Sequence, residues 1–129
     1  MDYFLMEFIG GIFLPDFLEI NSGEKGKIIP VLKGILSQCR QLDLLKVSKE
    51  EFIRPLKNVI VTSDPLSGDQ AVLLDFERCR NDLEPSNVTQ FCSFLGNHGY
   101  VDKSKVIELS QKYKQTYSQE DFDNLVNLL

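Results

Sequence analysis

The chain has 129 residues, of which 43% are hydrophobic and 26% charged, and these are ordinary values for one folded domain. Its formal net charge of -5 excludes a general electrostatic attraction to nucleic acid or to anionic membranes, so neither is an expected partner. Asp2, Glu7 and Pro15 interrupt the apolar N-terminal stretch. A membrane-spanning helix is therefore not expected there, and we expect a cytoplasmic location.

The cysteines and the histidine do not indicate a metal or disulfide site. Cys39, Cys79 and Cys92 form an odd set without a CxxC pair, which argues against a disulfide framework and against a tetrahedral zinc site. We expect buried or half-buried free thiols. His98 is the only histidine and lies in a turn-like Asn-His-Gly tripeptide, where a structural or exposed role is expected.

In chain order, residues 3–8 are typical of a short apolar strand that ends at Gly10-Gly11, and residues 15–20 of a short helix. Apolar residues then recur at three- and four-residue steps and predict a long helix over 28–45, with Pro30 in its first turn. The residues on its apolar face are Ile28, Val31, Leu32, Ile35, Leu36, Cys39 and Leu42.

A β-hairpin is predicted next. Residues 58–62 and 71–75 are strand-like, and the turn-forming residues 63–69 lie between them. Because the two strands are expected to pair, the start of the first and the end of the second should meet at one end of the hairpin.

Three helices are predicted after the hairpin, so residues 87–129 form a helical tail. Asn87 with Gln90 resembles a capping pair for a helix through Leu95 that Gly96 can end. Asp102 can cap a second helix, and Ser118 can cap a third. The expected fold is α+β and mainly helical, in a single domain over residues 1–129 with one small sheet.

Asn58 and Asp75 stand at the meeting end of the predicted hairpin. One amide oxygen and one carboxylate suit Mg²⁺, which binds through few protein ligands together with water and phosphate oxygens. Asparagine before a strand and aspartate after one are also common turn residues. Spacing alone therefore leaves a metal site and a structural role open.

The surrounding segments resemble protein kinases. Asp75-Phe76-Glu77 resembles the metal-binding Asp-Phe-Gly segment, and Lys57-Asn58-Val59-Ile60-Val61 resembles the end of the catalytic loop. Residues 4–11, FLMEFIGG, resemble the hinge between kinase lobes. Together with residues 37–43, 54–61, 74–80 and 87–91, these segments are similar to the predicted serine/threonine kinases of archaea, an atypical group related to the RIO and lipopolysaccharide-kinase-like kinases.

The resemblance implies a kinase-like C-terminal lobe and assigns roles to particular residues. It implies a hinge-like segment over 1–12 and a catalytic-loop and metal-site hairpin over 48–77. Asn58 and Asp75 match the Mg²⁺ ligands, Glu7 and Phe8 match the hinge that contacts the adenine of ATP, and Glu51 matches the general base. Lys57 flanks the phosphate region, as does Arg54, although either could instead pair with a surface carboxylate.

Two positions near these residues depart from the family. Lys49 stands where related proteins have histidine, and Phe52 stands at a leucine-like position. Glu51 also reads as a solvated charge in the Lys-Glu-Glu run, so its role stays open between the two interpretations.

The glycine-rich loop and the strand lysine that cover the phosphates in kinases are not recognised in the sequence, so the N-terminal lobe is expected to be absent. The expected function is therefore a truncated or split serine/threonine-kinase-like protein. ATP- and Mg²⁺-dependent phosphoryl transfer would require another chain to supply the N-terminal lobe. A non-catalytic, pseudokinase-like binding module and a decaying gene product are the alternatives. Expected partners are a separate N-lobe chain or a second copy of this chain, and the protein substrate is not readable.

Overall fold

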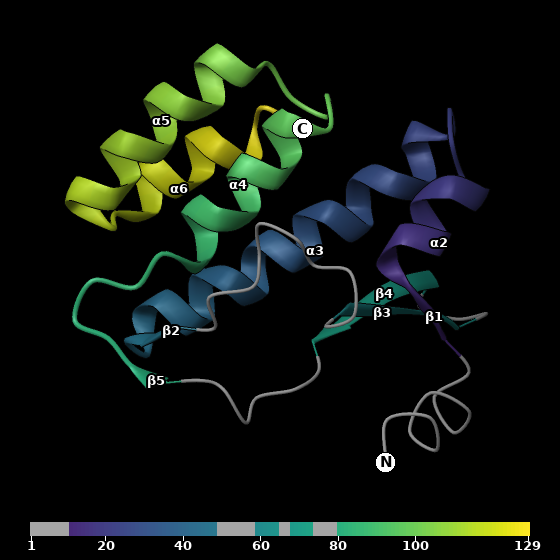
Figure 1. Cartoon of the computed structure of the whole chain (residues 1–129), viewed down its shortest axis with the longest axis horizontal. Coiled ribbons are helices and arrows are strands. Elements are labelled where there is room, and N and C mark those ends of the chain that lie inside the picture. Colours follow the sequence, from purple (N-terminus) through teal and green to yellow (C-terminus); the bar gives the residue numbers. More distant parts are fainter. Residues whose placement is uncertain (1–10, 49–58, 65–67, 74–79) are drawn as a thin grey trace. The chain divides into compact units, whose positions relative to one another are not determined.

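The computed structural model describes residues 11–48, 59–64, 68–73 and 80–129 (Figure 1). These residues form an α+β, mainly helical structure, as predicted. They belong to two compact units. The first comprises Met1–Ile35 and Pro55–Asp75, and the second comprises Leu36–Arg54 and Phe76–Leu129.

The first unit contains a three-stranded antiparallel sheet in the order β1-β3-β4. Its strands are β1 (Ile12–Phe13), β3 (Val59–Asp64) and β4 (Gly68–Leu73), and the short helix α2 (Leu14–Ile20) follows β1 directly. The predicted hairpin is thus confirmed, but the ladder extends further than predicted. Pairs from Val59 with Leu73 to Asp64 with Gly68 continue into the expected turn.

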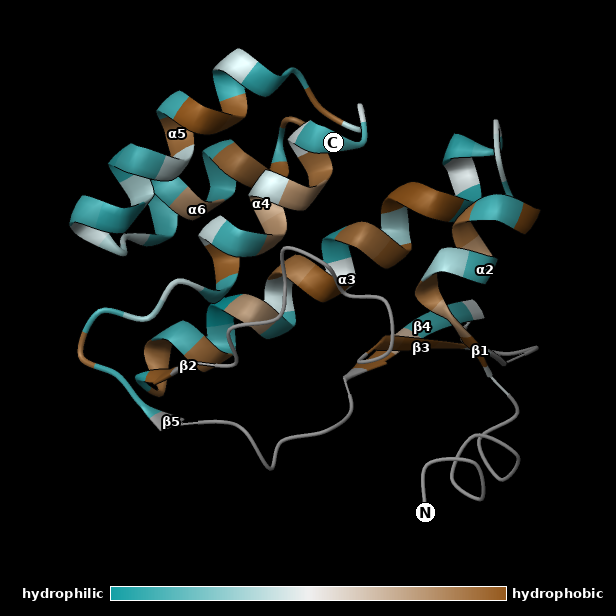
Figure 2. Cartoon of the chain, viewed as in Figure 1, coloured by the Kyte–Doolittle hydropathy of each residue, from teal (hydrophilic) through white to brown (hydrophobic). Residues whose placement is uncertain are grey.

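The core of the first unit forms around the apolar half of β3. Val59, Ile60 and Val61 are at most 3% exposed, and Figure 2 shows this stretch as continuously hydrophobic. Leu14 and Phe17 of α2 are also buried. A β-carbon on Gly11 would lie 2.3 Å from the Ile60 Cγ2 atom, so glycine permits the close approach of β1 to β3.

The long helix α3 (Lys25–Leu44) contributes its first eleven residues to the first unit and the rest to the second. The predicted apolar face is confirmed from Ile28 to Cys39, where every member is at most 5% exposed, whereas its last member, Leu42, is only half-buried. Because the helix begins at Lys25, Pro30 lies inside it and not in its first turn as predicted. The main-chain bond that proline cannot make would have reached Gly26, one turn earlier.

The second unit contains the helices α4 (Asn87–Asn97), α5 (Lys103–Thr116) and α6 (Gln119–Val126). The predicted caps of α5 and α6 are confirmed, because the side chains of Asp102 and Ser118 accept hydrogen bonds from main-chain N–H groups in the first turns. A short ribbon pairs β2 (Val47–Ser48) with β5 (Arg80–Asn81), and the sequence did not predict it.

Two predictions for α4 are wrong. Ser86, not Asn87, is the N-cap residue, and the Asn87 side chain is instead used in long-range contacts. The helix also continues past Gly96 and ends at Asn97, with His98 as its C-cap, and Gly99 then takes the left-handed conformation with φ of 77°. Gly96 serves a different purpose, since a β-carbon there would lie 3.0 Å from the Val106 Cγ1 atom of α5.

Candidate functional site

The predicted site residues lie outside the residues that the structure describes. They are Glu7, Phe8, Glu51, Arg54, Lys57, Asn58 and Asp75. The strands on either side of residues 49–58 and 74–79 are described, and their pairing shows which chain segments come together.

The open end of the β3–β4 hairpin borders both predicted metal ligands. Val59 lies opposite Leu73 in the antiparallel ladder. Asn58 directly precedes Val59 in the sequence, and Asp75 follows Leu73 by two residues. The predicted convergence of these two chain segments at one end of the hairpin is therefore confirmed as far as Val59 and Leu73, the described residues nearest to the ligands in the sequence.

The β2–β5 ribbon borders the same two segments at their other ends. Val47 pairs with Asn81 and Ser48 with Arg80. Residues 49–58 therefore connect β2 to β3, and residues 74–79 connect β4 to β5. The strands that precede the two segments are β2 and β4, and the strands that follow them are β3 and β5. Because β2 pairs with β5 and β3 pairs with β4, each segment runs from one antiparallel ladder to the other.

A buried polar cluster anchors the ribbon. Asn87 is fully buried, and its side-chain amide donates to the Asp43 Oδ1 atom at 2.9 Å and to the main-chain oxygen of Val47 at 2.6 Å. The main-chain N–H of Asn87 also donates to the Asp43 Oδ1 atom, at 3.1 Å. Asp43 and Asn87 thus fix the start of β2, two residues before the segment that contains Glu51.

The second Asp43 oxygen joins the ribbon anchor to helix α5. Tyr113 donates its hydroxyl to the Asp43 Oδ2 atom at 2.8 Å, and Arg40 donates to the Tyr113 hydroxyl at 3.2 Å. Burial raises the pKa of Asp43, although the hydrogen bonds from Tyr113 and Asn87 oppose the shift. Burial likewise raises the pKa of Tyr113, so its hydroxyl stays protonated and available as a donor.

Arg40 holds the corner between α5 and α6. Its guanidinium donates to the main-chain oxygen of Tyr117 at 2.6 Å and lies 5.5 Å from the ring centroids of both Tyr113 and Phe122. Tyr117 takes the left-handed conformation with φ of 50°, which is uncommon for a residue with a side chain. The hydrogen bond from Arg40 to the main-chain oxygen of Tyr117 stabilises this conformation.

Lys114 holds the segment that leads into α4. Its ammonium donates to the main-chain oxygen of Pro85 at 2.8 Å, to the Ser86 Oγ atom at 2.7 Å and to the main-chain oxygen of Glu84. The hydroxyl of Tyr117 donates to the same Pro85 oxygen at 2.7 Å. The last turn of α5 therefore fixes the entry to α4, where Asn87 stands.

Two thiols are buried within the same unit. Cys39 and Cys92 are free and at most 1% exposed, as predicted, whereas Cys79 lies outside the described residues. Burial raises the pKa of Cys92 to about 12 and that of Cys39 well above its ordinary value. His98 is exposed and packs on the Phe94 ring with centroids 4.5 Å apart, in keeping with the predicted structural role.

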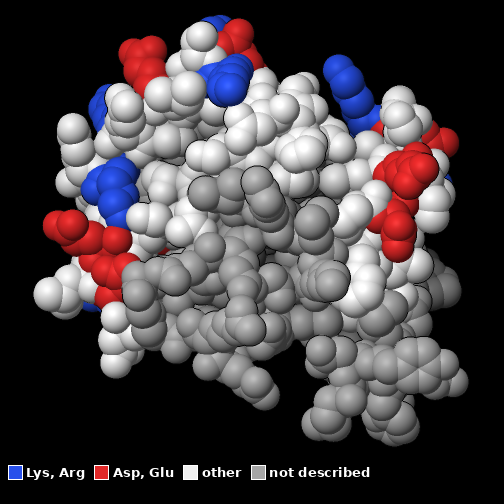
Figure 3. Space-filling view, in the orientation of Figure 1, with Lys and Arg blue, Asp and Glu red and all other residues white. Residues whose placement is uncertain are grey.

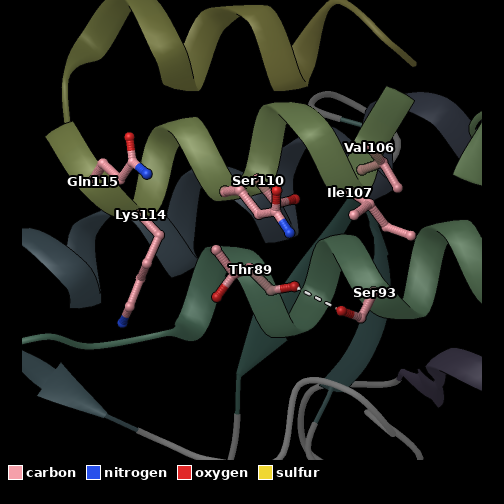
Figure 4. Close-up of a pocket in the computed structure, with 8 residues that line it drawn as sticks. Thr89, Ser93, Val106, Ile107, Ser110, Lys114 and Gln115 are labelled. Atoms are coloured by element: carbon pink, nitrogen blue, oxygen red, sulfur yellow. Dashed lines mark hydrogen bonds between the residues drawn. The ribbon is translucent and has the colours of Figure 1, made fainter. Parts of the chain in front are cut away.

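A groove of about 480 Å³ lies between α4 and α5. Figure 4 shows Thr89 and Ser93 on α4 facing the residues of α5 across this groove. The lining residues are Thr89, Ser93, Val106, Ile107, Ser110, Gln111, Lys114 and Gln115. Sequence reasoning did not single out this groove, because its two walls come from separate helices.

Within the described ranges, no group of three or more histidine, cysteine, aspartate or glutamate side chains could hold a metal ion. No helix of the described part of the chain is long and apolar enough to cross a membrane. On the face shown in Figure 3, the described basic and acidic side chains are interspersed and do not gather into one basic patch.

Comparison with known proteins gives no assignment: no family model, no curated protein and no solved structure matches the chain. Sequence reasoning missed the cluster of Arg40, Asp43, Asn87 and Tyr113. One signal was present, because Arg40 and Asp43 are charged residues beside the apolar face of the long helix. Their shared partner Tyr113 lies 73 residues from Arg40 and 70 residues from Asp43 in the sequence, and no local pattern predicts such pairs.

Proposed function

We propose that the chain is a protein-kinase-like C-terminal lobe in which Asn58 and Asp75 hold Mg²⁺ on ATP. The observation that carries this proposal is the antiparallel register of β3 and β4, with Val59 opposite Leu73. Residues that flank this pair share one end of the hairpin. One carboxylate and one amide oxygen there fit Mg²⁺ bound to a nucleotide, since phosphate and water oxygens complete its octahedral shell.

The anchoring of β2 supports the same proposal. Two segments used for the kinase resemblance, residues 37–43 and 87–91, are joined directly by the hydrogen bonds between Asp43 and Asn87. Asn87 also binds the Val47 oxygen, just before the segment with Glu51. Long-range contacts between separately recognised motifs are expected if those motifs belong to one site.

In this proposal, each residue has a limited chemical task. Asn58 and Asp75 would hold and orient Mg²⁺, which would supply charge neutralisation at the phosphates of ATP. Glu51 accepts the proton of an acceptor hydroxyl as that oxygen forms its bond to the γ-phosphorus and the bond to ADP breaks. Glu7, Phe8 and their neighbours contact adenine, and Lys57 lies near the phosphates.

The half of a kinase that covers the phosphates is not recognised in residues 1–129. Positioning and charge stabilisation provide nearly all the catalysis in phosphoryl transfer, and the glycine-rich loop and strand lysine contribute much of both. We therefore expect residues 1–129 alone to bind Mg²⁺·ATP weakly and to transfer no phosphate above background.

Calorimetric titration with ATP in the presence and absence of Mg²⁺ tests this function. Asp75→Asn should weaken Mg²⁺-dependent ATP binding at least about tenfold, equivalent to ~1.4 kcal/mol. Asp64→Asn, the same change at the closed end of the hairpin, is the matched control and should leave the affinity unchanged. Equal ATP affinities for the two variants, or an ATP affinity that does not depend on Mg²⁺, would contradict the proposal.

The second candidate function is a non-catalytic binding module. Lys49 at the histidine-like position favours it, because this change falls in the predicted catalytic loop itself. Robust phosphoryl transfer from radiolabelled ATP that Asp75→Ala abolishes would exclude the binding module and would show that the lobe is active alone.

A further inference from the structure

The groove between α4 and α5 has an apolar centre, hydroxyl and amide side chains around it, and one lysine, Lys114, in its lining. Val106 is buried, and Ile107 is 48% exposed although it is a large aliphatic residue. Hydroxyl and amide side chains line both walls (Figure 4). The lining contains no carboxylate, and the whole of α4 carries no charged residue.

Helix α5 gives the groove a positive charge that the chain as a whole does not have. It carries Lys103, Lys105, Lys112 and Lys114 against the single acidic residue Glu108, in a chain with a net charge of -5. Lys112 pairs with Asp121 at 3.7 Å. The three acceptors of Lys114 are neutral, so they fix its ammonium without neutralising it.

One cation, Lys114, lines the groove, and a second, Lys103, lies next to the groove on α5 without being a lining residue. Lys103 lies one turn before Ile107 and so shares its side of α5, and its Cα atom lies 3.6 Å from the β-carbon position of Gly96 on α4. Lys114 lines the groove at the other end of α5. Along α5, Lys103 and Lys114 therefore lie on either side of the apolar residue Ile107.

We propose that this groove docks an acidic amphipathic helix of a partner protein. An apolar side chain of that helix packs on Ile107, and its carboxylates face Lys103 and Lys114. A partner strand is disfavoured, because the main-chain groups of α4 and α5 are used within the helices and offer no edge for strand pairing. The proposal is independent of nucleotide binding, since it uses no residue of the hairpin.

The dimensions suit a short helical contact. From Ile107 to Lys114 the α5 wall covers eight residues, or about 10 Å along the axis, which is roughly two helical turns. Thr89 and Ser93 of α4 stand one turn apart on the facing wall. One apolar anchor flanked by carboxylates spaced over two to three turns matches this length.

The test uses the full chain, labelled with ¹⁵N, and two synthetic helical peptides of about 14 residues held by side-chain lactam bridges. Both carry leucines on one face, and the flanking positions are glutamates in one peptide and lysines in the other. The glutamate peptide should shift the amide resonances of Ser93, Ile107 and Ser110 and bind at least about tenfold more tightly than the lysine peptide.

Two pairs of variants give the controls. Lys103→Glu should weaken binding of the glutamate peptide about fivefold or more, whereas Lys105→Glu, the same charge change on another side of α5, should change it less than about twofold. Ile107→Ser should abolish the shifts, and Leu83→Ser, at a leucine that is 82% exposed outside the groove, should not.

Several results would overturn the proposal. They are equal binding of the two peptides, no shift with the glutamate peptide at ~1 mM, or equal effects of the two lysine variants. Octanoate producing the same shifts would assign the groove to a small carboxylic acid. Concentration-dependent shifts of the same amides without peptide would assign it to a second copy of the chain.

Discussion

Replacing Asn87 with alanine tests the anchor of β2 most sharply. The change removes the amide that donates to the Asp43 Oδ1 atom at 2.9 Å and to the Val47 oxygen at 2.6 Å, while the main-chain N–H bond to Asp43 at 3.1 Å is kept. A hydrogen bond to a carboxylate contributes ~1.5–3 kcal/mol, and one to a neutral carbonyl ~0.5–1.5 kcal/mol. The free energy of unfolding should fall by ~2–4 kcal/mol.

Urea unfolding followed by circular dichroism measures this loss, and the matched control is Asn97→Ala. Asn97 ends the same helix but is exposed, so its replacement should cost less than ~0.5 kcal/mol. Backbone amides of Val47 and Ser48 should also exchange with solvent faster in Asn87→Ala, because the ribbon loses its anchor. Equal stability of the two variants would refute the assignment of Asn87 as a long-range anchor.

Three further predictions concern the core and its ionisable groups. Gly11→Ala should destabilise the chain by at least ~1 kcal/mol in thermal unfolding, because the new methyl group would lie 2.3 Å from the Ile60 Cγ2 atom. The control is Gly34→Ala, where no atom lies within 4 Å of the new methyl group, and it should be neutral or stabilising by up to ~1 kcal/mol. The Asp43 carboxyl resonance should titrate above pH 3.8, as NMR would show. The contribution of this group to the free energy of unfolding should be fully present below pH 3.8 and should decline as the pH rises through the raised pKa. A titration below pH 3.8 would reverse this pH dependence of stability. Cys92, with its pKa raised to about 12, should resist iodoacetamide at pH 8 in the folded chain and react after unfolding, as peptide mass spectrometry would show.

Local patterns predicted the parts of the fold that local physics determines. The apolar period over 28–45 predicted both α3 and its buried face, because residues three and four apart share one side of a helix. Asp102 and Ser118 were recognised as caps because each bonds a main-chain N–H within three residues. The hairpin followed from a β-branched run in 58–62 and an apolar run in 71–75, on either side of turn-forming residues.

The remaining features depend on distant partners. Asn87 looks like a capping residue in its local sequence, but its side chain bonds Asp43, which is 44 residues away. The β2–β5 ribbon has two residues in each strand, too few for any periodicity to indicate it. The candidate metal site stays a prediction, since the sequence and the hairpin register bring its segments together and Asn58 and Asp75 themselves lie outside the described residues.

The measurement that tests the central proposal most directly is paramagnetic broadening by Mn²⁺, used in place of Mg²⁺, in the presence of ATP. Broadening falls steeply with distance, and the β4 strand from Leu73 to Gly68 spans about 17 Å. We predict that the amide resonances of Val59 and Leu73 broaden first and those of Ser63 and Gly68 last, and that Asp75→Asn removes the effect. Broadening that is uniform along the hairpin, strongest at Gly68, or unchanged by Asp75→Asn would contradict a nucleotide-metal site at the open end of the hairpin.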